Sequence, residues 1–181
     1  VPQAPEIAAR SYLLLDITAN QLLDQKDIDS PVEPASLTKL MTAYVVFSAI
    51  KKNRLTLNQT VPVSDSAWRM IGSRMFIEPN KQVTVDELIR GMIVQSGNDA
   101  CIALAEAVAG SEAGFTNLMN KEAERMGMKN THFTNTTGLP DPNHYTTAHD
   151  LTLLATAIIR DFPEFYPLYS LKEYTYNNIT Q

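Results

Sequence analysis

The chain has 181 residues, of which 44% are hydrophobic and 19% charged, so a single domain has enough apolar material for a core. Its formal net charge of -5, without any basic stripe, argues against a nucleic-acid partner. No apolar run approaches the roughly 20 residues that span a membrane, and the single cysteine excludes a disulfide within the chain.

The N-terminal part predicts a polar lead-in followed by a β-hairpin. Residues 1–10 are the lead-in, and residues 12–17 form a short apolar run. Residues 21–25 form a second extended segment, and the polar residues 18–20 between the two suit a turn.

A long apolar helix is predicted from Ser36 to about Ile50. Its residues Leu37, Leu40, Met41, Tyr44 and Phe47 recur at helical spacing, and most of its other faces are apolar too. A helix that is apolar nearly all round belongs in a core. The pair Lys51 and Lys52 marks its exit into water, where the helix dipole favours cations.

Lys39 is the exception in this helix, because it places a cation in the first turns of a buried segment. Desolvation there is expected to lower its pKa, and a neutral lysine can accept a proton. Ser36 lies three residues earlier, so both side chains fall on one helix face, at an N-terminus that favours developing negative charge. These residues are candidates for an activated nucleophile and its base. The alternative is an N-capping serine and a lysine that reaches the surface, and spacing alone favours it.

Two more helices are predicted around a Ser96-Gly97-Asn98 connector. The first covers residues 84–95, with Thr84 and Glu87 as a capping box. Gly97 suits the left-handed position after this helix, and Asn98 suits the N-cap of the alanine-rich helix at residues 99–109.

The rest of the chain predicts two capped helices and short extended pieces. Ser111 caps one helix, which ends at Gly127, and Thr147 caps another, which stops at Pro163. The extended pieces are residues 60–63, 75–77 and 174–176, and residues 128–146 are expected to be a loop.

The sequence predicts no metal and no cofactor. The three histidines, His132, His144 and His149, lack metal-ligand spacing, and no glycine-rich phosphate loop is present. A Ser-His-Asp triad gains no support, because no Gly-x-Ser-x-Gly elbow occurs.

The order and context of the two serine motifs carry a resemblance to a known family. Ser36-Leu37-Thr38-Lys39 opens a buried helix, and Ser96-Gly97-Asn98 follows in a connector between helices. The segments at residues 34–42, 95–101, 136–139 and 146–151 add to the likeness, which runs from about Ser11 to the end. The chain resembles the low-molecular-mass penicillin-binding proteins, the serine D-alanyl-D-alanine carboxypeptidases of bacterial cell walls.

The resemblance implies a mechanism and a setting. Ser36 would attack the carbonyl of the penultimate D-Ala and Lys39 would take its proton. Ser96 would relay a proton towards the leaving D-Ala, while Asn98 would hold Lys39 and contact the substrate amide. The implied partners are peptidoglycan stem peptides ending in D-Ala-D-Ala and β-lactam antibiotics, in the periplasm on the outer side of the inner membrane. The Ser36 N–H would supply half of the oxyanion hole, and such a donor is typically worth ~3–4 kcal/mol.

The implied fold is α+β of the β-lactamase and DD-peptidase type, a sheet flanked by helices plus an all-helical lobe. Sheet-associated elements are expected at about residues 11–59 and 160–181, and the helical lobe at about residues 60–159. The family's third motif, Lys-Thr-Gly, does not occur in the sequence. The 181 residues are therefore expected to be the N-terminal portion of a catalytic domain, without the C-terminal membrane anchor common in the family.

Three alternatives remain at this point. A class A β-lactamase shares the Ser-x-x-Lys chemistry, but usually has Asp where Gly97 stands and a glutamate after the second motif. A DD-endopeptidase of the same superfamily uses the same motifs. A non-catalytic peptidoglycan-binding fragment would fit the missing third motif.

Overall fold

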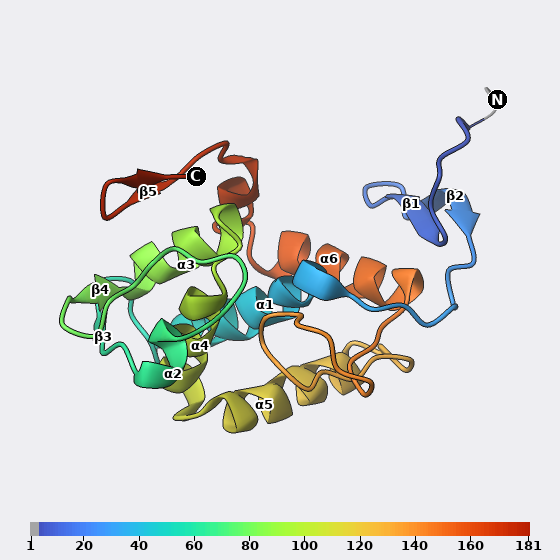
Figure 1. Ribbon diagram of the computed structural model, residues 1–181. Helices are drawn as coiled ribbons and strands as arrows, with labels where there is room; N and C mark the ends of the chain where they lie inside the picture. Colours follow the sequence, from blue (N-terminus) through green and yellow to red (C-terminus); the bar gives the residue numbers. More distant parts are fainter. Residues whose placement is uncertain (1–3) are drawn as a thin grey trace.

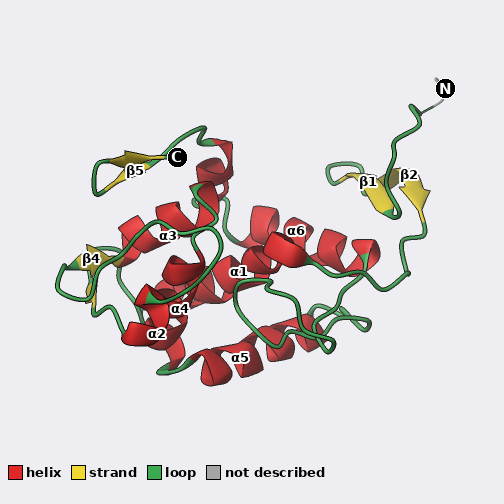
Figure 2. Cartoon of the chain, in the orientation of Figure 1, coloured by secondary structure: helices red, strands yellow, loops and turns green. Residues whose placement is uncertain are grey.

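The computed structural model describes residues 4–181, so the first three residues of the predicted lead-in lie outside the described part. Helices form the centre of the molecule, and three small two-stranded antiparallel sheets lie at its edges (Figures 1 and 2). The helices are α1 (Thr38–Lys51), α2 (Asp65–Trp68), α3 (Val85–Val94), α4 (Asn98–Ala109), α5 (Glu112–Arg125) and α6 (Ala148–Asp161). The strands are β1 (Tyr12–Asp16), β2 (Gln21–Lys26), β3 (Thr60–Val61), β4 (Val83–Thr84), β5 (Thr175–Tyr176) and β6 (Ile179–Thr180), with short 3-10 helices η1 (Ala35–Leu37) and η2 (Tyr166–Ser170).

Helix α1 is the central element, as its apolar sequence predicts. It packs against α3, α4, α5 and α6, and nearly all of its side chains are buried. Phe47 stacks on Phe165 at a ring distance of 4.3 Å and meets the edge of Phe162 at 5.6 Å, which ties α1 to the chain after α6. The α-helix proper begins at Thr38, because the predicted first turn at Ser36 is the 3-10 helix η1.

Helices α3, α5 and α6 begin where their capping residues predict. The Thr84 hydroxyl accepts from the Glu87 N–H while the Glu87 carboxylate accepts from the Thr84 N–H, so the predicted capping box forms. Ser111 accepts from the Gly114 N–H at the start of α5, and Thr147 caps α6 in the same way. These contacts satisfy helix N–H groups that would otherwise lack partners.

The hairpin of β1 and β2 is confirmed, with an irregularity in the pairing between Leu14 and Leu15. The lone strand predicted at residues 174–176 is half of a second hairpin, since β5 pairs with β6. The turn is made by Asn177 and Asn178, both with left-handed backbone at φ 55° and 63°, which is the pair of conformations that a tight hairpin needs.

The strand predicted at residues 75–77 is wrong, although the one near Thr60 forms as β3, paired with β4. The side chain of Asp99 accepts the backbone N–H groups of Met75, Phe76 and Ile77, at 2.8 to 3.1 Å. Phe76 has a positive φ of 67°, which breaks the extended conformation. A side chain from α4 therefore replaces the strand partner that the pattern suggested.

The described residues hold no sheet of more than two strands. In Figure 1 the β1–β2 hairpin lies at one end of the helices and the C-terminal hairpin lies above α3 at the other. The expected division into sheet-associated and helical-lobe residues stays a prediction. None of the helices within residues 4–181 is long and apolar enough to cross a membrane.

Candidate active site

Ser36 lies on η1, at the N-terminal end of α1, and its side chain faces solvent. The residue before it, Ala35, has a left-handed backbone at φ 47°. Such a conformation costs a non-glycine residue on the order of 1–3 kcal/mol and persists only where the surroundings impose it. Here a strained turn presents the Ser36 hydroxyl outside the helix that carries it.

Lys39 lies directly behind Ser36 and is buried, with 8% of its surface exposed. Its Nζ is 3.2 Å from Ser36 Oγ and donates a hydrogen bond to the backbone carbonyl of Thr137 at 2.8 Å. Burial lowers the pKa of Lys39, as its position in an apolar helix predicts. In its neutral form, an amine that donates to Thr137 would still have a lone pair with which to accept a proton from Ser36.

Ser96 also contacts Ser36, with its Oγ donating to Ser36 Oγ at 3.2 Å. The structure therefore brings together three of the residues that the resemblance singles out: Ser36, Lys39 and Ser96. Ser36 and Ser96 are 60 positions apart in the sequence. They meet because α3 and α4, whose connector carries Ser96, pack beside α1.

The connector that carries Ser96 differs from its predicted conformation. Ser96 itself is left-handed at φ 53°, whereas Gly97 has φ −66° and is the N-cap of α4 in place of Asn98. Gly97 is needed for space, because a Cβ there would lie 3.2 Å from the Met75 backbone nitrogen and 3.3 Å from the Gly91 carbonyl oxygen. The sequence pattern places a glycine correctly but assigns it the wrong reason.

Asn98 is buried beside this group, but its side chain does not hold Lys39. Its Nδ2 donates to the carbonyl of Ile71 at 2.8 Å, and its backbone N–H donates to the Ser73 carbonyl. Among the described residues, the hydrogen bonds of the Lys39 amine go to Ser36 and Thr137. Asn98 therefore ties the loop at residues 71–73 to the start of α4.

Thr137 and Gly138 are parts of the candidate site that the sequence interpretation missed. The segment contributed to the resemblance, but it received no role. Gly138 has φ 90°, and a Cβ there would lie 1.8 Å from the Ala35 carbonyl oxygen. Only glycine lets this loop approach the strained turn at Ser36 closely enough for Thr137 to reach Lys39.

Cys101 is buried near Lys39 as an inert thiol, in agreement with its apolar helix. Burial raises the pKa of Cys101 to about 12, so the thiol stays protonated at neutral pH. Among residues 4–181, no three histidine, cysteine or acidic side chains gather as metal ligands.

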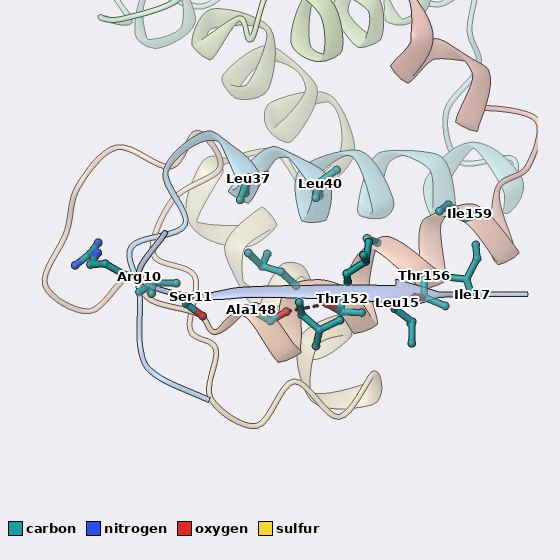
Figure 3. Close-up of a pocket in the computed structure, with 15 residues that line it drawn as sticks. Arg10, Ser11, Leu15, Ile17, Leu37, Leu40, Ala148, Thr152, Thr156 and Ile159 are labelled. Atoms are coloured by element: carbon teal, nitrogen blue, oxygen red, sulfur yellow. Dashed lines mark hydrogen bonds between the residues drawn. The ribbon is translucent and has the colours of Figure 1, made fainter. Parts of the chain in front are cut away.

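Two hollows adjoin this part of α1. One, of about 460 Å³, contains Ser36, Lys39 and Ser96 and has Met92, Ile93 and Tyr169 as apolar walls. The other, of about 570 Å³, is an apolar groove between β1, α1 and α6, shown in Figure 3. Leu37 and Leu40 line both. The hollow of about 460 Å³ contains Ser36, Lys39 and Ser96 together, so it is the candidate substrate cleft.

The profile of the D-alanyl-D-alanine carboxypeptidase family matches residues 1–181. The chain belongs to this family. Two relatives in Escherichia coli are the D-alanyl-D-alanine carboxypeptidases DacD, 46% identical over 99% of this chain, and DacC, 44% identical over 99%. The chain spans 48% of DacD and 46% of DacC, about half of their length.

The family likeness extends to three dimensions. The crystal structure of penicillin binding protein 5 from Haemophilus influenzae matches with a TM-score of 0.96 and 43% sequence identity. The match covers 100% of this chain and 54% of that one. The likeness confirms the predicted fold class, the N-terminal part of an α+β penicillin-binding catalytic domain.

Proposed function

We propose that this chain carries the acylation centre of a serine-type D-alanyl-D-alanine carboxypeptidase. One observation carries the proposal: Ser36 Oγ lies 3.2 Å from both Lys39 Nζ and Ser96 Oγ. A hydroxyl between a neutral amine and a second hydroxyl has a base on one side and a proton relay on the other. The carboxypeptidase and penicillin-binding relatives give the substrate class.

In the proposed reaction, the Ser36 oxygen attacks the carbonyl carbon of the penultimate D-Ala, and its proton moves to Lys39. The tetrahedral intermediate places negative charge near the first N–H groups of α1, where the helix dipole stabilises it. The peptide C–N bond then breaks, and the departing D-Ala nitrogen receives a proton through Ser96. Water releases the remaining peptide from Ser36 and restores the hydroxyl.

A β-lactam would enter by the same first step, because its strained amide presents the same kind of carbonyl to Ser36. The amide nitrogen stays attached after the ring opens, so the product remains on the enzyme as a stable adduct. The rate of this step should rise with pH through the pKa of Lys39, since only the neutral amine accepts the proton. Burial lowers that pKa, so the rise should come below the ordinary range for lysine.

The natural substrates under this proposal are peptidoglycan stem peptides that end in D-Ala-D-Ala. Their location supports the periplasm, at the outer face of the inner membrane, as the compartment, with membrane attachment through a C-terminal anchor. Because the chain spans about half of its curated relatives, activity should be assayed both on this chain and on a longer one with a Lys-Thr-Gly strand.

The test is the intact mass of the protein before and after exposure to benzylpenicillin. The unmodified chain should gain one penicilloyl group, and Ser36→Ala should gain none. The matched control is Ser66→Ala, which removes an exposed serine of α2 and should acylate normally. An adduct that persists in Ser36→Ala contradicts the assignment, and release of D-Ala from a D-Ala-D-Ala peptide separates a carboxypeptidase from a β-lactamase.

A further inference from the structure

His144 is a buried titratable side chain that the proposed reaction does not use, with only 3% of its surface exposed. Its Nδ1 accepts a hydrogen bond from the backbone N–H of Thr134 at 2.9 Å, and its Nε2 is 2.8 Å from the Thr38 hydroxyl. A backbone N–H can only donate, so Nδ1 carries no proton. In a neutral imidazole the proton is then on Nε2, which donates to Thr38.

This contact joins the loop at residues 130–147 to the turn of α1 that holds Lys39. Thr38 lies between the nucleophile and the lysine in sequence, and Thr42 lies one helical turn further along the same face. The Thr42 hydroxyl donates to the carbonyl of Thr136 at 2.7 Å. The next carbonyl of the loop, that of Thr137, receives the Lys39 amine.

The loop between these contacts is held from behind as well. The N–H of Thr136 donates to Glu112 at the start of α5, and Asn135 accepts from the N–H groups of Thr137 and Gly138. These bonds fix the shape of residues 135–138. The hydrogen bonds that join the loop directly to α1 come from Thr38, Lys39 and Thr42.

We propose that neutral His144 is a positioning residue for Lys39, which rests on the function proposed above. By bridging Thr134 to Thr38, it holds the loop against α1 so that the Thr137 carbonyl keeps the lysine amine aimed at Ser36. His144 touches neither the nucleophile nor the reacting carbonyl, and it acts through the position of Thr137 alone.

Protonation of His144 would break this bridge. An imidazolium has a proton on both nitrogens, so Nδ1–H would face the Thr134 N–H, 2.9 Å away, as one donor against another. The Thr134 hydroxyl lies farther from Nδ1, at 3.4 Å, and could accept this proton only if the ring moved away from the Thr134 N–H. Burial lowers the pKa of His144, the Asp141 carboxylate opposes that shift, and His132 adds to it. Arg10 and Glu33 line the surface hollow that His144 adjoins, and from α1 the uncharged Thr38 faces the ring. The bridge should therefore hold at neutral pH and fail in acid.

The first measurement is the rate of Ser36 acylation by benzylpenicillin from about pH 5 to about pH 9, in the unmodified chain and in His144→Gln. In the unmodified chain, below the pKa of Lys39, the rate should be inversely proportional to the proton concentration. Below the pKa of His144, the rate should be inversely proportional to the square of the proton concentration. Gln cannot take up a proton, so His144→Gln should keep the first-power dependence throughout and acylate about tenfold more slowly at about pH 8.

His149→Gln is the matched control, because His149 is exposed on α6 and bonds to Asp29, away from the loop. It should reproduce the rate and pH profile of the unmodified chain. An unchanged rate and an unchanged pH profile in His144→Gln would overturn the inference.

The second measurement does not depend on acylation. Nitrogen-15 shifts of the imidazole in the unmodified chain should give a bare Nδ1 and a protonated Nε2 at about pH 7. Exchange of the Gly138 amide, which donates to Asn135 at 2.8 Å, should be about tenfold faster in His144→Gln and unchanged in His149→Gln. If the chain takes up no penicillin, the proposed function fails, and these two readouts still decide the bridge. A protonated Nδ1 or unchanged exchange would overturn it.

Discussion

The two hollows beside α1 share Leu37 and Leu40 but are built in different ways. Around Ser36, two hydroxyls, an amine and one backbone carbonyl from three separate segments form hydrogen bonds of 2.8 to 3.2 Å. The groove at the β1–β2 hairpin is apolar, and nearby leucines of the hairpin stay exposed, Leu14 by 55% and Leu23 by 56%. The hollow at Ser36 is therefore built from packed segments of this chain, whereas the groove at the β1–β2 hairpin has exposed leucines beside it.

The difference shows which parts of the molecule set the geometry of the site. Lys39 lies on α1, which is enclosed by other helices, and Ser36 lies on η1 directly before it, while Ser96 and Thr137 reach them from other segments. A close-packed interior resists small displacements, so the distances between groups held by it vary little. The hairpin contacts α6 but contributes no hydrogen bond to the group around Ser36 among the described residues.

The contrast between the packed helices and the β1–β2 hairpin is tested most strongly by truncating one leucine in each region. Leu88 of α3 is fully buried, and Leu23 of β2 is 56% exposed. Leu88→Ala should lower the free energy of unfolding by roughly 2–5 kcal/mol, because it leaves a cavity. Leu23→Ala should change it by less than about 0.5 kcal/mol. Urea unfolding followed by circular dichroism measures both, and similar losses from the two variants would refute the contrast.

The variant Gly138→Ala tests whether the loop that carries Thr137 sets the geometry around Ser36. Gly138→Ala would drive a Cβ into the Ala35 carbonyl, so the loop must move away from Ser36. Acylation by benzylpenicillin should slow by about 100-fold, because a shift of ~1 Å in a catalytic group can cost that much. Gly127→Ala is the control, since Gly127 has a similar φ of 78° but no atom within 4 Å of the added Cβ. Equal acylation rates in Gly138→Ala and Gly127→Ala would show that the close approach of Gly138 to Ala35 does not set the geometry around Ser36.

Tyrosine hydroxyls give a smaller, paired test. The Tyr44 hydroxyl of α1 donates to Asp161 at 2.6 Å and accepts from Arg125 at 2.8 Å, so it links three helices. Tyr44→Phe should cost about 1–3 kcal/mol of unfolding free energy, because it leaves part-buried polar groups without their partner. Tyr12→Phe on β1, where the exposed hydroxyl has Asp24 of β2 as its partner, should leave the free energy of unfolding nearly unchanged. A loss at Tyr12 as large as that at Tyr44 would show that the hairpin is as firmly held as the helices.

The sequence predicts well what depends on neighbouring residues. The capping box of Thr84 and Glu87 and the shared face of Ser36 and Lys39 follow from spacing along one helix, and both occur. The paired strand β6 could also have been found, because Asn177 and Asn178 are a hairpin-turn signal that was overlooked.

What the sequence does not predict depends on residues distant in the chain. The Thr137 carbonyl reaches Lys39 across a separation of 98 positions, and nothing in the local pattern marks that carbonyl as its partner. Asp99 turns a strand-like segment at residues 75–77 into a loop by taking its N–H groups. The left-handed backbone at Ser96 and the tight packing of Gly97 are likewise visible only in the folded chain.

The smallest expected effect is the most direct test of the hairpin's independence. Leu14→Ser replaces an exposed leucine of β1 that lines the groove, so little apolar surface is lost from the interior. Stability should change by less than about 0.5 kcal/mol, and acylation of Ser36 should keep its rate. A slower reaction in a stable Leu14→Ser protein would mean that the groove acts on Ser36 through the shared wall of Leu37 and Leu40. The two hollows would then be one mechanical unit, and the packed helices alone would not account for the geometry of the site.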